Sequence, residues 1–384
     1  MDYLLEARFA RKDSAMTNDN DKLKNKKKVD LLIRSLRIVF IIGFFVFTAL
    51  FINETLIQPY KMKKSIEKAQ NLYNHDFTLD EDESEELPSN ELLDEVEISD
   101  IESDGKLVSS DNISPIPTPD PYRDDLGRLR KFSRLLEINE DVKGWIRIDN
   151  INGENDTKID YVVVQSSSQD PEYYLTRDWA THDYLKAGSI FLDSSSSVET
   201  NSRNLIIHGH NMTSSDDMFH YLLEYKDINF LKEHPIISFD SIYEEGLWKV
   251  FSVYITPGNN DRGDFFPYVR SDFSDDRDYL EYIYQIRVRS QYNIDDVDIR
   301  EDDQILTLST CSYELSDYRT IIVARKIRDG EDPTVDTDSI HKNKKVLNPA
   351  SFYKHYGGKA PEIPSLDEAL EKGLIPWYNP KEAN

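Results

Sequence analysis

The longest apolar stretch of the chain lies close to its amino terminus. Residues 38–52 contain no charged side chain and are almost wholly apolar, and residues 31–33 and Leu36 extend the stretch. A helix of about 20 residues crosses a bilayer core of roughly 30 Å. Residues 31–54 are therefore predicted to form a transmembrane signal-anchor helix, in which Arg34 and Arg37 reach the near interface with their long side chains.

A different pattern begins after residue 140, where short runs rich in β-branched and aromatic residues are separated by turn signals. The runs predicted to be strands are 145–148, 161–165, 189–192, 205–208, 236–239, 248–255, 304–310 and 319–327. About eight short strands in succession are typical of a mainly β fold that closes, or nearly closes, into a barrel. The expected architecture is a closed eight-stranded β-barrel.

Apolar positions at helical spacing accompany this β pattern. Residues 124–138 are predicted to form a helix that packs on the start of the domain, and 217–225 leads into a second short helical segment before Pro235. Residues 273–289 form a helix inserted just upstream of the strand that carries Cys311. Residues 365–372 are expected to form a short helix that ends at Gly373, within a tail that either packs across the domain or trails from it.

The formal net charge of −26 is concentrated in one segment. Between Asp76 and Asp111 the only basic residue is Lys106, and little of the segment is apolar. Self-repulsion favours a disordered, extended spacer there, although binding of cations or of a basic partner is an alternative. The alternate prolines of 114–121 favour polyproline II and mark a domain boundary. Nucleic-acid binding is disfavoured because a chain of this sign repels phosphate.

The flanks of the apolar stretch predict its orientation. Five lysines lie between residues 22 and 28, whereas the chain becomes acidic beyond the first turns on the other side. The positive-inside rule places residues 1–30 in the cytoplasm and the rest outside the cell. Residues 55–122 then form a juxtamembrane stem and spacer, 123–330 the β-rich folded domain, and 331–384 an extension of unknown role. A cleaved signal peptide is the alternative, but no small-residue cleavage site follows Phe51.

Candidate catalytic residues lie at the ends of predicted strands. Cys311, the only cysteine, ends one strand and Arg319 opens the next, so a hairpin would bring them together. His208 and His210 end an earlier strand on one face, and geometry alone does not choose between them. Thiol, imidazole and guanidinium are the parts needed for acyl transfer through a thioester.

Each of these residues also has a structural interpretation. The thiol could be buried and inert, and Arg319 could form an ion pair with Asp317. Arg325 lies six residues farther along the same face and is the competing arginine. The remaining histidines show no zinc-ligand spacing, so no metal and no cofactor is expected.

The residues around the thiol carry a family resemblance. Thr307-Leu308-Ser309-Thr310-Cys311 with Arg319, together with Gly209-His210-Asn211, resembles the active-site signature of sortases. Further matching sequence motifs indicate class B: Gly144-Trp145-Ile146-Arg147-Ile148, Tyr173-Tyr174-Leu175 and Ala187-Gly188-Ser189-Ile190-Phe191-Leu192-Asp193. The resemblance runs from about residue 123 to 328. Val162 departs from it, since the family usually has proline there, and the tail after residue 328 has no counterpart.

The resemblance implies a sortase-like barrel, in which the inserted helix walls the substrate groove, and a membrane-anchored cysteine transpeptidase. Cys311 would be the nucleophile, His210 the general acid and base, and Arg319 the oxyanion stabiliser. Ser309 and Thr310 would line the substrate pocket. Tyr313, in the loop after the cysteine, is a weaker candidate for a substrate contact.

The implied substrates are secreted proteins with a carboxyl-terminal sorting signal, cleaved after threonine. The acyl group would pass to an amine of peptidoglycan or of a pilin in a Gram-positive cell envelope. A cysteine protease acting by hydrolysis and a non-catalytic surface binding module are the rival interpretations. One sequence does not reveal the sorting motif, the acceptor or the client proteins.

Overall fold

The computed structural model describes residues 3–74, 120–261 and 264–380, with side chains from residue 24 onward. The acidic spacer predicted for residues 76–111 lies outside the described residues. The chain divides into two compact units, Met1–Lys61 and Met62–Asn384.

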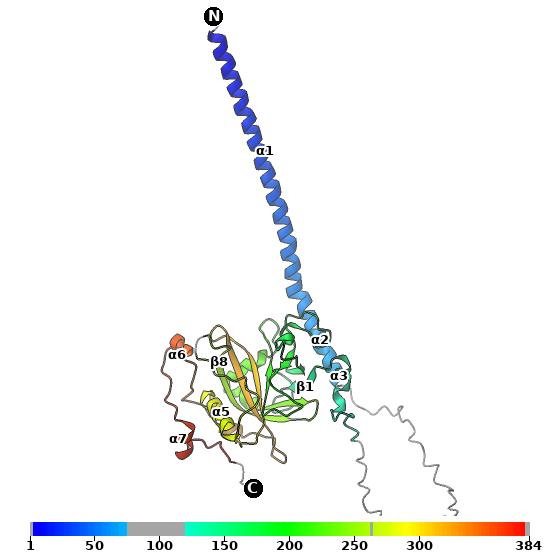
Figure 1. Cartoon of the computed structure of the whole chain (residues 1–384), viewed down its shortest axis with the longest axis vertical. Coiled ribbons are helices and arrows are strands. Elements are labelled where there is room, and N and C mark those ends of the chain that lie inside the picture. Colours follow the sequence, from blue (N-terminus) through cyan, green and yellow to red (C-terminus); the bar gives the residue numbers. More distant parts are fainter. Residues whose placement is uncertain (1–2, 75–119, 262–263, 381–384) are drawn as a thin grey trace, which may run out of the picture. The chain divides into compact units, whose positions relative to one another are not determined.

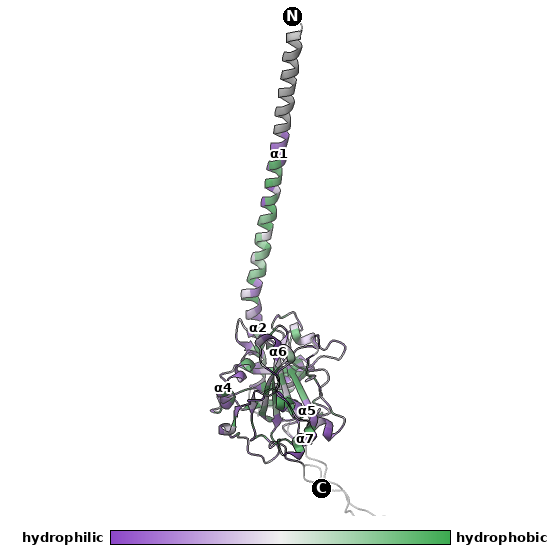
Figure 2. Ribbon diagram, turned by 90° about the vertical axis from the view of Figure 1, so that its left-hand side faces the viewer, coloured by the Kyte–Doolittle hydropathy of each residue, from purple (hydrophilic) through white to green (hydrophobic). Residues whose placement is uncertain are grey.

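The first unit is dominated by the helix α1 (Tyr3–Ile52), which continues through a π-helical turn, η1 (Asn53–Ile57), into α2 (Gln58–Tyr73). Figure 2 shows a continuous hydrophobic band along the second half of α1. Apolar side chains all round this band, such as Phe40, Phe44 and Phe47, are more than half exposed. A helix that is apolar on every side needs an apolar surrounding. Within the described residues, this is the one helix long and apolar enough to cross a bilayer.

The second unit is built around a closed barrel (Figure 1). The strands follow one another around the barrel in the order β1-β2-β3-β4-β10-β11-β8-β7. Their bounds are β1 Val142–Arg147, β2 Asp160–Val164, β3 Ile190–Leu192, β4 Asn204–His208, β7 Ile236–Ser241, β8 Leu247–Pro257, β10 Ile305–Ser312 and β11 Tyr318–Lys326. All neighbours are antiparallel except β2 with β3 and β4 with β10.

The closed eight-stranded barrel predicted from the sequence is confirmed, and each predicted run corresponds to one of these strands. Differences are confined to the ends. β1 begins at Val142, three residues earlier than predicted, across a β-bulge between Val142 and Gly144. Two short sheets accompany the barrel: β5 (Asn211–Met212) with β6 (Asp217–Met218), and β9 (Tyr292–Asn293) with β12 (His341–Lys342).

The inserted helix before the cysteine strand is also confirmed. It is α5 (Asp276–Arg289), three residues shorter than predicted because the side chain of Asp275 caps it by accepting from the backbone N–H of Asp278. The segment between β6 and β7 forms η5 (His220–Lys226), a 3₁₀ helix, and then α4 (Ile228–Glu233).

The helix expected over residues 124–138 is wrong in its first half. Only η3 (Arg130–Phe132) and α3 (Ser133–Ile138) are helical. The Asp124 carboxylate accepts hydrogen bonds from the backbone N–H groups of Leu126 and Arg128, and Gly127 has a φ of +75°. Local side-chain hydrogen bonds and a left-handed glycine make a turn instead of a helix.

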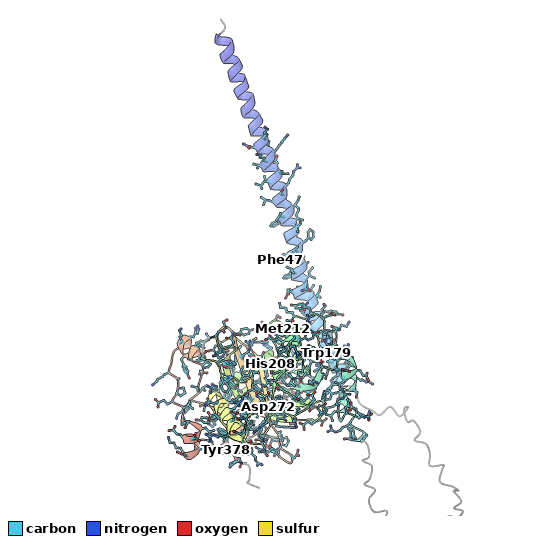
Figure 3. The ribbon with its side chains drawn as sticks, in the orientation of Figure 1. Phe47, Trp179, His208, Met212, Asp272 and Tyr378 are labelled. Atoms are coloured by element: carbon cyan, nitrogen blue, oxygen red, sulfur yellow. The ribbon has the colours of Figure 1, made fainter. Side chains whose placement is uncertain are left out.

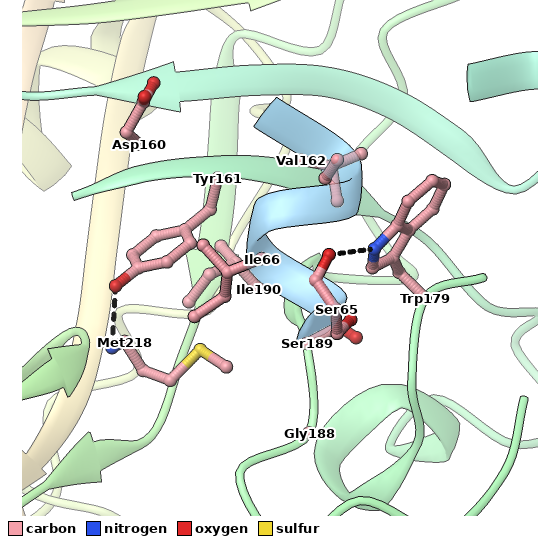
Figure 4. A pocket seen from close by; sticks show the side chains of 11 residues that line it. Ser65, Ile66, Asp160, Tyr161, Val162, Trp179, Gly188, Ser189, Ile190 and Met218 are labelled. Carbon is pink, nitrogen blue, oxygen red and sulfur yellow. Dashed lines mark hydrogen bonds between the residues drawn. The ribbon is translucent and has the colours of Figure 1, made fainter. Parts of the chain in front are cut away.

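The end of α2 packs on the barrel, although the sequence placed the start of the domain near residue 123. Trp179 donates a hydrogen bond from its indole nitrogen to the carbonyl oxygen of Ser65 at 3.2 Å, beside a small pocket (Figure 4). The Tyr73 ring stacks on Trp145 with ring centroids 4.2 Å apart. The Tyr73 hydroxyl donates to Asp240 Oδ2 at 2.9 Å. These contacts attach Met62–Tyr73 to the second unit.

The tail beyond residue 330 packs on the same unit. β12 pairs with β9, and the tail also contains the 3₁₀ turn η6 (Thr337–Ser339) and the helices α6 (Ala350–Tyr356) and α7 (Leu366–Glu371). Leu366, Ala369 and Trp377 are buried. Ser365 and Glu368 form a capping box at the start of α7, and Gly373 follows its end with a φ of +63°. The short helix predicted for this segment is therefore present.

Replacing Tyr73 with alanine is expected to destabilise the barrel unit by about 2–4 kcal/mol, because an aromatic ring and a hydrogen bond are lost together. Urea unfolding of the full-length chain in detergent would measure the change. Tyr60 provides the control on the same helix, since it is 67% exposed and its replacement should change stability by less than about 0.5 kcal/mol. Equal effects at the two positions would contradict the packing of α2.

Candidate active site

A hairpin places the thiol opposite a guanidinium. β10 and β11 pair antiparallel, and Cys311 lies directly across from Arg319 in the register. The turn between the strands ends at Asp317, which has a φ of +60°. Cys311 is partly exposed, whereas its neighbours Thr310 and Ser312 are buried. The strand thus presents the thiol at its end while its flanks fix the backbone.

The parallel pairing of β4 with β10 brings the histidines alongside. His208 is the register partner of Ser309. The chain then continues along β10, because the N–H of Gly209 donates to the Ser309 carbonyl and the Thr310 hydroxyl donates to the Gly209 carbonyl at 2.9 Å. A Cβ at Gly209 would lie 2.7 Å from the Phe219 ring and 2.5 Å from Ile190 Cδ1, so a side chain here would force both neighbours to shift. His210 follows immediately.

One groove of about 360 Å³ contains these groups. Cys311, His210 and Arg319 line it together, as the sequence predicted for the three strand ends. The remaining lining residues that matter below are Glu172, Leu175, Asp193, His208, Gly258, Tyr268, Ser309 and Thr310. A thiol, an imidazole and a guanidinium around one cavity can perform acyl transfer.

The tautomer of His210 follows from its hydrogen bond. Nε2 lies 2.8 Å from the carbonyl oxygen of Leu175, which can only accept, so Nε2 carries the proton and Nδ1 holds the lone pair of the neutral ring. Burial lowers the pKa of His210 below its ordinary value of 6.5, and the charge of Arg319 acts in the same direction. The bond to Leu175 opposes them. A neutral imidazole is therefore favoured in the absence of substrate.

Arg319 is held by the turn that precedes it. Its Nη1 lies 3.1 Å from Asp317 Oδ1 and 3.2 Å from the carbonyl oxygen of Tyr318. Asn259 donates to the other oxygen of Asp317 at 2.7 Å. A Cβ at Gly258 would lie 2.9 Å from Arg319 Cζ, so this glycine leaves room for the guanidinium. The ion pair with Asp317 considered from the sequence exists, and it orients an arginine that also lines the groove.

Arg325, the competing arginine, lies elsewhere. Its side chain is fully buried, and its Nη1 and Nη2 donate to the two carboxylate oxygens of Glu331 at 2.7 and 2.6 Å. Lys249 also reaches Glu331, at 2.8 Å. Arg325 does not line the groove, and its contacts are those of a structural ion-pair network.

The predicted substrate contacts divide into two groups. Ser309 and Thr310 line the groove and are both 2% exposed. The Ser309 hydroxyl lies 3.0 Å from the Tyr268 hydroxyl. Tyr313 is 63% exposed and is not among the residues that line the groove. Its contact with a substrate stays a prediction.

The sequence analysis did not name Asn211 as a candidate site residue, although it belongs to the Gly209-His210-Asn211 motif. Its amide nitrogen donates to the carbonyl oxygen of Cys311 at 3.1 Å. Its amide oxygen accepts from His220 Nδ1 at 2.8 Å, and His220 Nε2 lies 3.3 Å from Asp216. This chain of contacts fixes the backbone of the thiol residue. Among the described residues, no group of three or more His, Cys, Asp or Glu side chains is placed to hold a metal ion.

Comparison with known proteins gives a consistent result. Residues 155–327 match the family model of the sortase domain. The chain is 32% identical over 200 residues to sortase B of Staphylococcus aureus, and the aligned region covers 52% of this chain and 75% of that protein. It is 33% identical over 215 residues to sortase B of Listeria monocytogenes, covering 56% and 78%.

Among solved structures, sortase B from B. anthracis in complex with AAEK1 superposes with a TM-score of 0.51 and 26% identity, over 71% of this chain and all of that one. The overall fold of the barrel unit is thus shared with a solved sortase B. The chain belongs to the class B sortases.

Proposed function

We propose that this protein is a membrane-anchored cysteine transpeptidase that joins secreted proteins to an amine of the cell envelope. The observation that carries the proposal is the single groove lined by Cys311, His210 and Arg319. The sortase family membership supports the same reaction class.

In the first half-reaction, neutral His210 takes the proton of the Cys311 thiol, and the resulting thiolate attacks the carbonyl carbon of a threonine in the sorting signal. The C–S bond forms, the scissile C–N bond breaks, and protonated His210 gives its proton to the leaving amine. Arg319 donates hydrogen bonds to the carbonyl oxygen as negative charge develops there. Ser309 and Thr310 form the floor of the groove beneath the threonine, and Tyr313 contacts the substrate from the rim.

In the second half-reaction, an acceptor amine replaces the leaving peptide. Its nitrogen attacks the thioester carbon, a proton passes to His210, and the thiolate departs. The acceptor is an amine of a peptidoglycan precursor or of a pilin subunit. No cofactor and no metal take part in this scheme.

The anchor in this proposal is the apolar part of α1. Residues 31–54 span the membrane, residues 1–30 stay in the cytoplasm because of their lysines, and the barrel works outside. Residues 55–122 connect the anchor to the barrel, and residues 123–330 form the catalytic domain with its groove. Residues 331–384 are an extension to which no catalytic role is assigned.

The test uses the full-length chain in detergent with a set of threonine-containing sorting peptides, with and without diaminopimelate or glycine amine. Mass spectrometry is expected to show a peptide joined to the amine, in preference to free acid. Free acid alone in the presence of amine would favour a cysteine protease. An absence of both products across the peptides would favour a binding module.

A further inference from the structure

The groove carries opposite charges on its two sides. Four neighbouring strands in the order β3-β4-β10-β11 form this part of the wall. Asp193 follows the end of β3, His208 ends β4, Cys311 lies near the end of β10, and Arg319 opens β11. The thiol therefore has Arg319 on one flank and the pair of Asp193 and His208 on the other, and all four line the groove.

Asp193 and His208 form a well-defined pair at the barrel wall (Figure 3 labels His208). Asp193 Oδ2 lies 3.0 Å from His208 Nε2, and each side chain is 19% exposed. Asp193 Oδ1 accepts from the N–H and the hydroxyl of Ser195 at 2.9 and 2.6 Å. Burial opposes ionisation, but the hydrogen bonds from His208 and Ser195 outweigh it and lower the pKa of Asp193 to about 2. The carboxylate is charged throughout the neutral range.

A second histidine–aspartate pair shows what is unusual about this one. His234 Nε2 lies 2.8 Å from Asp156, and its Nδ1 is also used, at 3.0 Å from the Phe230 carbonyl. That ring is 1% exposed and lies outside the groove. His208, by contrast, has no hydrogen-bond partner for Nδ1 among the described residues. With the proton on Nε2, a lone pair on Nδ1 is free to accept from a ligand.

We propose that Asp193 and His208 form the subsite that receives the acceptor amine of the transpeptidation. The proposal rests on the function proposed above. An amine of the cell envelope arrives as an ammonium ion, which is attracted to the carboxylates of Asp193 and Glu172 and repelled by Arg319. It therefore enters from the flank of the thiol opposite the oxyanion donor.

The proton balance follows from this placement. The ammonium group gives one proton to Nδ1 of His208 and becomes a free amine. The nitrogen attacks the thioester carbon, the C–N bond forms, and the C–S bond breaks with its electron pair returning to sulfur. The second proton leaves the nitrogen for His210, and His208 releases its proton to water. The products are the amide, a thiolate and a protonated His210, and return of that proton to sulfur restores the thiol and the neutral imidazole for the next cycle.

The test compares a cationic and a neutral nucleophile in the second half-reaction. The variants are His208→Gln, which keeps a donor to Asp193 but cannot take up a proton, and Asp193→Asn, which removes the charge. Full-length chains in detergent are first loaded with a sorting peptide, and the thioester is then resolved with diaminopimelate or with hydroxylamine. Hydroxylamine is uncharged near neutral pH and needs no carboxylate partner.

Both variants are expected to form the thioester within about threefold of the wild-type rate. The rate with diaminopimelate should fall by about tenfold or more, with a larger fraction lost to hydrolysis, while the rate with hydroxylamine changes by less than about threefold. His234→Gln is the matched control, because it breaks a similar pair away from the groove and should leave the ratio of the two rates unchanged.

Equal losses with both nucleophiles, or no loss with either, would overturn the subsite and assign the pair a structural role. The same pattern of selectivity in His234→Gln would also overturn it. A wild-type chain that forms no thioester would overturn the proposed function, and the subsite with it; that outcome is visible before any variant is made.

Discussion

Replacing Cys311 with alanine is expected to abolish formation of both the thioester and the amide product, lowering the rate by at least about 10⁴-fold. The reason is chemical, since no other described residue in the groove offers a thiol to carry the acyl group. The fold should persist. The backbone of residue 311 keeps its pairing with Arg319 and its hydrogen bond from Asn211, neither of which uses sulfur.

The measurement is mass spectrometry of the intact full-length chain after incubation with the sorting peptide, together with thermal unfolding. Wild type should gain the mass of the acyl fragment, and the alanine variant should gain none at an unchanged unfolding temperature. Cys311→Ser serves as a size-matched control that keeps a weak nucleophile. Amide product from the alanine variant at the wild-type rate would show that the nucleophile lies elsewhere.

The barrel could be predicted because each of its strands is recognisable from the residue pattern of its own segment. Apolar, β-branched runs such as that of β10 are bounded by turn residues, and this information lies within each segment. The hairpin that joins Cys311 to Arg319 is equally local, since only a short loop separates the two strands. The parallel pairing of β4 with β10, which adds His210, is not local. The sequence did not predict this pairing, and the resemblance to sortases implied only that His210 acts together with Cys311.

What the sequence did not predict depends on partners distant in the chain. The segment that ends at Tyr73 reads as a generic amphipathic helix, and its docking depends on Trp145 and Asp240. The turn at Asp124 replaces a helix because one carboxylate competes for backbone N–H groups. The pattern could not separate His208 from His210, since both face the groove. Only their different hydrogen-bond partners, Asp193 and Leu175, distinguish them.

Arg319 and Arg325 provide the sharpest comparison, because they lie six residues apart on one strand and, within the sequence, only the position of Arg319 closer to the thiol separated their roles. Arg319→Gln is expected to lower kcat/KM by about 10²–10³, equivalent to about 2.7–4 kcal/mol, because one oxyanion donor is lost. Its ion pair with Asp317 is partly exposed, with side chains 27% and 40% accessible, so the stability should change by less than about 1 kcal/mol.

Arg325→Gln should lower the stability of the fold and leave kcat/KM nearly unchanged. Its fully buried guanidinium donates to Glu331 and lies 3.5 Å from Asp298, so its removal takes one cation from each of these partly buried carboxylates and leaves them Lys249 and Arg328. Losing the paired hydrogen bonds between this charged guanidinium and Glu331 is expected to cost about 2–3 kcal/mol in the free energy of unfolding. Urea unfolding and steady-state transpeptidation of both variants, below the unfolding transition, measure the two effects separately. A loss of activity without destabilisation in Arg325→Gln, or destabilisation without loss of activity in Arg319→Gln, would reverse the assignment. The crossed pattern would establish that β11 presents a catalytic cation at one end and a structural one at the other.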